Sequence, residues 1–395
     1  MRLTLTTALL TALALPAAAQ DWQEILDEAR GQTVYWNAWG GDGRTNAFIE
    51  WVGERTEELY GVSVEHVKLS DTAEAVTRVV SEKAAGRDDD GSVDLIWING
   101  PNFLTMKDQD LLYGPFVSDL PNSQYVDLSA DAPAAVDFTE PVEGMESPWR
   151  LAKFVFIHNQ ARVDAPPASM AAMVDWAEAN PGRLTHPDPS NFMGATFLKQ
   201  ALIELAPDRY ALQQPVTDEA WQAAAEPLWA WYDALRPNLW RDGESFPENE
   251  SVQHQLLNDG EVDISMAFDP AAAASLIQQG LLPETARVFV PDEGSLGNVS
   301  FVAIPYNAAH AEGAMVVANF LLAPETQAHM QNIEVLGSYS VLDPETLDAE
   351  AQTAFDALPD APALPALDEL GDTLLEPHAS WMTRLTEAWT ERYTR

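Results

Sequence analysis

The sequence predicts an α/β fold of two lobes joined by crossing strands, a hinged clam whose cleft can close on a ligand. At 395 residues, two domains are the natural expectation. Strand-like and helix-like segments alternate through the first part of the chain, which indicates βαβ units and a parallel sheet. A long β-type run at residues 151–159 suits a strand that leaves one lobe and enters another. Extended segments at 288–291 and 299–305 then return the chain to the first lobe.

The first lobe begins with a β-rich segment at residues 33–39, followed by an amphipathic helix at 45–60. Residues 62–67 alternate as a second strand, residues 73–85 have the pattern of a second helix, and residues 93–98 form a third strand. Each strand is separated from the next by one helix, as parallel pairing requires.

The second lobe starts near residue 147. In it we expect helices at 169–179, 194–205, 221–235 and 250–258, and strands at 183–187 and 262–268. After the return we expect helices at 311–322 and 325–332, an irregular excursion at 343–367 rich in Pro and Asp, and a closing helix at 377–393. The predicted division is therefore 20–150 for the first part of lobe one, 151–295 for lobe two, and 296–395 for the return to lobe one with a C-terminal helical segment.

The first nineteen residues predict secretion. A positive charge at Arg2, an apolar stretch and small residues at Ala17 and Ala19 are typical of a signal peptide cleaved after Ala19. The apolar stretch is too short to span a bilayer, and we expect a soluble mature chain with no membrane insertion.

Composition restricts the partners of the chain. Lys and Arg number 21 against 62 Asp and Glu, a net charge of −41 that disfavours nucleic acid and anionic lipid. With no cysteine, the chain has no disulfide, thiolate metal site or lipid-anchored N-terminal cysteine. Export without lipid or disulfide fits a periplasmic location.

Six segments resemble a known family, the extracellular solute-binding proteins of ABC importers, and within it the YnjB-type subfamily. They are ARGQTVYWNAWGGD (Ala29–Asp42), GSVDLIWINGPNF (Gly91–Phe103), ESPWRLAKFVFIHN (Glu146–Asn159), GNVSFVAIPYNA (Gly297–Ala308), VVANFLLAPETQ (Val316–Gln327) and LLEPHASWMTRLTEAW (Leu374–Trp389). The resemblance implies a periplasmic-binding-protein fold, a small-molecule ligand, a cognate permease and, indirectly, its ATPase subunit. We expect a monomer without cofactor or metal; the resemblance does not give the ligand.

Ligands of open α/β sheets bind beyond the carboxyl ends of the strands, and this rule nominates the candidate residues. From the first lobe and the crossover these are Trp39, Gly41, Asp42, Asn99, Asn102, Phe103 and Trp149. From the second lobe and the returning loop they are Asn191, Phe192, Phe268, Asp269 and Asn298. Several have an ordinary structural alternative: Asp42 and the asparagines can cap helices or turns, and Trp149 can pack in the hinge.

Two ligand classes follow from the same loops. Trp39, Trp149, Phe103 and Phe192 with Asp42 and Asp269 would form an aromatic cage with carboxylates for an amine or quaternary ammonium. Alternatively, Gly40, Gly41 and Gly194 would present backbone N–H groups to an oxyanion. The acidic composition favours the cation.

An enzyme is the weaker interpretation. The sequence has no G-x-S-x-G, H-E-x-x-H or P-loop motif, and its 7 histidines are scattered without i, i+4 spacing. We therefore predict no catalytic residue. The alternatives are a secreted interaction protein or chemoreceptor partner, and a secreted α/β hydrolase.

Overall fold

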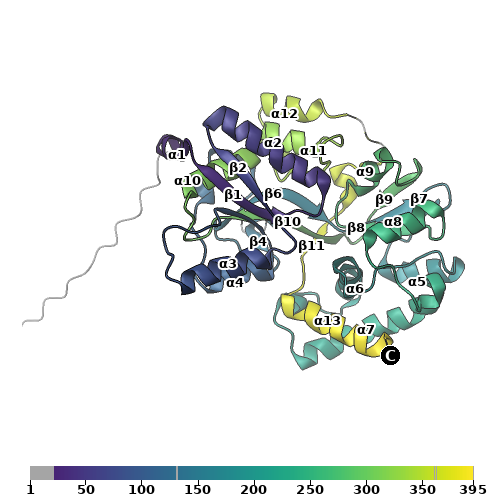
Figure 1. Cartoon of the computed structure of the whole chain (residues 1–395). Coiled ribbons are helices and arrows are strands. Elements are labelled where there is room, and N and C mark those ends of the chain that lie inside the picture. The colour runs from purple at the N-terminus through teal and green to yellow at the C-terminus, as the bar shows by residue number, and fades with distance from the viewer. Residues whose placement is uncertain (1–21, 130–131, 360, 362, 395) are drawn as a thin grey trace, which may run out of the picture.

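The computed structural model describes residues 22–129, 132–359, 361 and 363–394. They form two α/β lobes, with helices on the outside and strands crossing between the lobes (Figure 1). The predicted signal peptide lies outside the described residues. In the described part of the chain, no helix is long and apolar enough to cross a membrane.

The first lobe is a sheet covered by helices on both faces (Figure 1). Its strands are β1 (Thr33–Trp39), β2 (Ser63–Leu69) and β3 (Leu95–Ile98), with a small hairpin of β4 (Val136–Asp137) and β5 (Glu140–Pro141). Its helices are α1 (Trp22–Ala29), α2 (Gly43–Tyr60), α3 (Ala73–Ala84), α4 (Pro101–Asp108), α10 (Ala311–Leu321), α11 (Pro324–Gln331) and α12 (Ala349–Asp356).

The second lobe is built on a three-stranded antiparallel sheet, in the order β8 (Ile264–Ala267), β7 (Val155–Asn159) and β9 (Ala286–Phe289). Its helices are α5 (Met170–Ala179), α6 (Phe192–Leu205), α7 (Asp218–Leu235), α8 (Glu250–Asp259), α9 (Ala272–Gln278) and α13 (Ala379–Tyr393). The C-terminal helix α13, which the predicted division joins to the returning segment, packs on the helices of this lobe. Its apolar stripe of Trp381, Leu385 and Trp389 is buried beside α6 and α7.

Two long strands join the lobes. β6 (Glu146–Lys153) pairs antiparallel with residues 297–303 of β10 (Ser295–Ala303), and β10 also pairs with β3 and with the short β11 (Thr373–Leu374). The sheet order is β11-β10-β3-β1-β2, with β6 on the side of β10. Because β3, β1 and β2 are parallel, their carboxyl ends meet at one edge, which faces the second lobe.

Four predicted elements differ from the structure. The segment 288–291, expected to return the chain to the first lobe, overlaps β9, which pairs with β7 in the sheet of the second lobe. The run at 151–159 is two strands, because Phe154 ends the pairing of β6 with β10 and β7 then joins the second sheet. Residues 183–187 form only an isolated bridge between Leu184 and Ile264, since Pro187 has no N–H to donate to a ladder. The segment 343–367 contains helix α12, whose first turn is capped by the Asp348 carboxylate.

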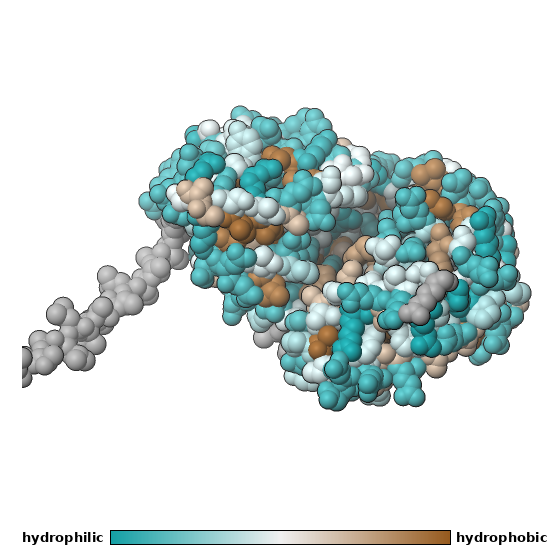
Figure 2. Space-filling model, turned by 60° about the horizontal axis from the view of Figure 1, so that its bottom comes forward, coloured by the Kyte–Doolittle hydropathy of each residue, from teal (hydrophilic) through white to brown (hydrophobic). Residues whose placement is uncertain are grey.

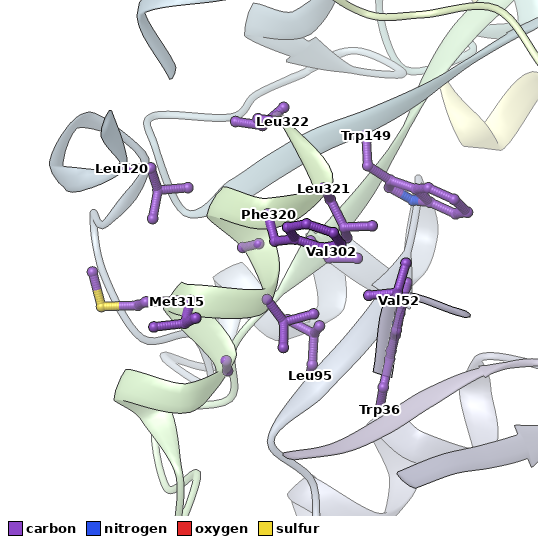
Figure 3. Packing of buried hydrophobic residues seen from close by; sticks show 14 of the residues in the cluster. Trp36, Val52, Leu95, Leu120, Trp149, Val302, Met315, Phe320, Leu321 and Leu322 are labelled. Atoms are coloured by element: carbon purple, nitrogen blue, oxygen red, sulfur yellow. The ribbon is translucent and has the colours of Figure 1, made fainter. Parts of the chain in front are cut away.

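The core of the first lobe centres on Trp149. Its ring lies edge-on to Trp36 and Trp97, with centroids 5.8 and 5.1 Å away, and stacks on Phe48 at 6.1 Å. Figure 3 shows Trp149 and Trp36 among aliphatic side chains from α2, β10 and α10. The hinge strand β6 is thus anchored in the core of the first lobe.

Candidate functional site

A cleft of about 440 Å³ lies between the lobes. Its lining residues are Trp39, Ser70, Asp71, Thr72, Trp97, Asn102 and Phe192. Six come from the first lobe, at or beyond the ends of β1 and β2 and around β3, and Phe192 begins α6 of the second lobe. Figure 2 shows the surface hollowed between the two halves of the molecule. The cleft lies at the carboxyl edge of the parallel strands, where ligands of open α/β sheets bind.

Two aromatic side chains from opposite lobes are exposed in this cleft. Trp39 is 43% exposed and Phe192 is 46% exposed, although aromatic residues of this size are usually buried. The Trp39 indole covers Gly41, where an added Cβ would lie 2.2 Å from the ring. Phe192 packs edge-on against Phe268, with centroids 5.2 Å apart. Gly41 and Phe268 therefore support the two exposed rings from behind.

The loop after β2 forms the polar side of the cleft. The Asp71 carboxylate accepts a hydrogen bond from the Ala73 N–H at 2.8 Å, and Glu74 Oε1 accepts from the N–H groups of Ser70 and Asp71 at 3.1 Å each. The Thr72 hydroxyl donates to the Trp97 carbonyl at 3.2 Å. These bonds hold a carboxylate and two hydroxyls in place at the cleft before any ligand arrives.

Asp42 and Asn191 cap helices. The Asp42 carboxylate accepts from the N–H and the hydroxyl of Thr45 at 2.7 Å each, at the start of α2. Asn191 Oδ1 accepts from the Met193 N–H at 2.9 Å, at the start of α6. Both side chains thus adopt the capping alternative, beside the exposed rings of the cleft.

Phe103 and Trp149 do not face the cleft. Both side chains are fully buried, Trp149 in the core described above and Phe103 on the buried face of α4. The structure therefore corrects the expectation that these rings would line the site. The cause is packing: a large aromatic ring that can be buried completely on its own lobe gains more apolar contact there than at an open edge.

The remaining predicted residues lie around the cleft in structural roles. Asn99 Nδ2 donates to Asp137 Oδ1 at 3.1 Å and to the Val299 carbonyl at 2.7 Å, which fixes the loop leading to the cleft residue Asn102. Burial raises the pKa of the Asp137 carboxyl to about 7. Asn298 is half-buried on β10, and Asp269 accepts from Arg150 Nη2 at 2.9 Å.

The sequence predictions missed Trp97 and the loop 70–72. The rule that nominates residues beyond strand ends applies to β2 as it does to β1 and β3, so it could have found the loop. Trp97 lies inside β3, where an aromatic residue is typical of the core, and only the structure places it at the cleft.

Histidines take part in packing. His186 is buried, stacked on Phe197 at 4.8 Å, and its Nε2 hydrogen-bonds to the Tyr232 hydroxyl at 2.9 Å. Burial lowers the pKa of His186 to about 4. Within the described ranges, no group of three or more His, Asp and Glu side chains could hold a metal ion.

Glu250, in the first turn of α8, is expected to make the stability of the fold depend on pH. Burial raises the pKa of its carboxyl from 4.5 to about 7, and the nearby Asp269 charge adds to the shift. The folded state therefore holds this proton more tightly than the unfolded state, so its contribution to stability is present below about pH 4.5 and lost as the pH rises through about 7. Glu250→Gln, which cannot ionise, should gain stability relative to the wild type over this window, measured by urea unfolding at pH 4, 6 and 8. A difference that is constant with pH would contradict it.

The chain is similar to proteins of one known family. Residues 51–363 match the model of bacterial extracellular solute-binding proteins. The chain is also 42% identical to Protein YnjB of Escherichia coli (strain K12), over 98% of this chain and 97% of that protein. The chain belongs to this family. The resemblance to solute-binding proteins of ABC importers, including the YnjB-type subfamily, is confirmed.

Solved structures of extracellular solute-binding proteins confirm the two-lobed fold. A putative extracellular solute-binding protein from Bordetella parapertussis matches with a TM-score of 0.67 and 15% identity, over 91% of this chain and 98% of that chain. The spermidine/putrescine substrate-binding protein PotD from Streptococcus pneumoniae matches with a TM-score of 0.60 and 19% identity, over 91% and 98%. At these identities the match establishes the fold alone. The family role implies a small-molecule ligand and a cognate permease.

Proposed function

We propose that this extracellular solute-binding protein captures a small cationic organic solute, an amine or quaternary ammonium, in the cleft between Trp39 and Phe192. The observation that carries the proposal is the exposure of these two rings from opposite lobes beside the Asp71 carboxylate. A cation between aromatic faces is attracted by the negative face of each ring, and a nearby carboxylate adds an ion pair. The net charge of −41 would also raise the local concentration of cations.

The alternative ligand class, an oxyanion bound by the backbone N–H groups of glycines, has less support. An added Cβ at Gly194 would lie 2.2 Å from the Pro187 carbonyl oxygen and 2.4 Å from that of Asp188, so this glycine allows close backbone packing. Gly41 lies under the Trp39 ring and Gly40 lies against the Lys68 side chain. These contacts explain why each position is a glycine, and the Gly40 N–H already donates to the Leu69 carbonyl at 3.0 Å, so it is not free for an oxyanion.

In this account the chain is exported with residues 1–19 removed, acts in the periplasm as a monomer without cofactor, and catalyses no reaction. The solute binds first to one lobe and closure adds contacts from the other, which requires tighter binding to the closed state. The permease then receives the closed form. A secreted interaction protein remains the competing interpretation, and it predicts no small ligand.

A thermal-shift screen of the refolded, ligand-stripped mature chain tests the proposal. The screen compares choline-type amines, diamines and amino acids with sugars and oxyanions. A ligand at about 100-fold above its Kd should stabilise the native state by about 2.7 kcal/mol. Shifts with amines support the proposal; shifts with oxyanions alone, or with nothing, reject it.

Substitution of the two rings locates the site. We expect Trp39→Ala and Phe192→Ala each to weaken binding of an amine found in the screen by about 10-fold or more, since a buried aromatic contact in a complex contributes about 1–3 kcal/mol. Isothermal titration calorimetry measures the change. Tyr210→Ala is the matched control, because Tyr210 is 75% exposed and does not line the cleft. Equal effects of all three substitutions would contradict this location.

A further inference from the structure

We propose that Arg150 binds an anionic group of the same solute, so that the ligand is a zwitterion: an amine or quaternary ammonium that also has a carboxylate or phosphate. This inference rests on the proposed function, because it places the second charge of a solute whose cationic end lies between the aromatic rings. It assigns a specificity role to a residue on the hinge strand.

A β-bulge brings Arg150 to the face of the sheet on which Trp97 lies. Val302 of β10 pairs with Trp97 on one side and with Ser147 on the other, so these three side chains share a face. In regular register Ser300 would pair with Trp149. The register instead shifts between Ser300 and Phe301, and Ser300 pairs with Arg150. Ser300 and Val302 are two residues apart on β10, so their side chains lie on the same face of the sheet. Arg150, as the partner of Ser300, therefore lies on the face that carries Trp97.

One contact agrees with this placement. The Arg150 guanidinium carbon lies 5.9 Å from the centroid of the Trp97 ring, and Trp97 lines the cleft. Trp97 therefore contacts both the proposed site of the cation and the guanidinium. A metabolite-sized solute can span the two.

The donors of Arg150 are incompletely used. Its Nη2 donates to Asp269 Oδ2 at 2.9 Å, while its Nε is buried without a hydrogen-bond partner. The side chain is only 14% exposed. A guanidinium has five N–H groups arranged to grip a carboxylate or phosphate through two bonds, and a buried donor left without a partner is costly. An anionic group of the ligand would supply the hydrogen-bond acceptor that the protein does not provide for this guanidinium.

The surrounding charges leave Arg150 available. The Asp269 carboxylate also interacts electrostatically with the Arg44 guanidinium, and one of its oxygens accepts a hydrogen bond from the Ala271 N–H at 2.9 Å. Arg44 in turn donates to the Val335 carbonyl at 2.8 Å and to Ser275 on α9 of the second lobe. One carboxylate is therefore shared between two guanidinium groups, and Arg44 is already held by the second lobe. Of the two, Arg150 is the one with an unpartnered buried donor.

Matched probes test the inference by calorimetry on the ligand-stripped mature chain: choline, which has the cation alone, against glycine betaine and phosphocholine, which add a carboxylate or a phosphate. We expect at least one zwitterion to bind about 10-fold or more tightly than choline, as charge-assisted bonds to arginine allow. If the carboxylate is the recognised group, glycine betaine binds more tightly than phosphocholine, and the reverse order identifies the phosphate.

Two variants assign this preference to Arg150. Arg150→Gln should reduce zwitterion binding to the level of choline while leaving choline binding within about 3-fold. Asp269→Asn keeps the arginine but removes its competing carboxylate, so it should tighten zwitterion binding even if Arg150→Gln fails to fold. If choline binds as tightly as both zwitterions, or if Asp269→Asn weakens zwitterion binding, the inference is overturned and the proposed function stands. If no probe binds, the inference is overturned, and the thermal-shift screen of other amines decides the proposed function.

Discussion

Replacing Trp149 by alanine is expected to lower the free energy of unfolding by about 3–5 kcal/mol, the cost of removing a large aromatic side chain from a core. The ring is fully buried and contacts Trp36, Phe48 and Trp97, so its removal leaves a cavity lined by three rings that cannot collapse together. The residue is also the bulge of the hinge strand, so the loss affects the strand that joins the lobes.

Guanidinium unfolding of the mature chain measures this effect. Trp39→Ala is the matched control, because it removes the same side chain from a site where it is 43% exposed, and we expect it to cost less than about 1 kcal/mol. Similar losses in the two variants would contradict the assignment of Trp149 to the core and Trp39 to the cleft.

Breaking the Lys199–Glu376 ion pair is expected to have an effect of similar size. The ammonium and carboxylate lie 2.5 Å apart, with side chains 2% and 1% exposed. Lys199→Met leaves Glu376 as a buried charge without its partner, which costs about 3–5 kcal/mol, whereas replacing both with apolar residues is often close to neutral. The double variant Lys199→Met, Glu376→Leu should therefore recover most of the stability lost in the single variant.

The control for this pair is Arg392 with Asp233, whose side chains are 48% and 49% exposed at 2.9 Å. Arg392→Met should change stability by less than about 1 kcal/mol, because exposed pairs are screened by water and salt. If the double variant is as unstable as Lys199→Met, loss of the ion pair does not explain the lower stability. Altered packing around α6 would then be the cause.

Most of the fold follows from local sequence patterns. The β-rich segment at 33–39 corresponds to β1, and the alternation at 62–67 corresponds to β2. The apolar stripe predicted for the closing helix is the buried set Trp381, Leu385 and Trp389 of α13. Periodicity works for α13 because one face of this helix is buried, and β-branched and aromatic composition identifies the two strands. Periodicity fails at 151–159, where the apolar run Phe154–Ile157 continues from the end of β6 into β7, so no break in the pattern marks the change of sheet at Phe154.

The candidate site was less predictable. Trp39, Asn102 and Phe192 were nominated from strand and helix ends and all three line the cleft. Trp97 and Trp149 both lie within strands, yet one lines the cleft and the other is fully buried, because burial depends on which strands become neighbours. Arg150 was not nominated because its placement depends on a one-residue bulge between two strands almost 150 positions apart, which no local pattern records.

The most direct test of the central claim is ¹⁹F NMR of the mature chain with all 13 tryptophans replaced by 5-fluorotryptophan, the Trp39 resonance being assigned with Trp39→Phe. Choline and glycine betaine serve as probes. A bound probe should shift the Trp39 resonance strongly and leave that of Trp389, buried in the second lobe, unchanged. Binding that leaves the Trp39 resonance in place would contradict a solute site between Trp39 and Phe192.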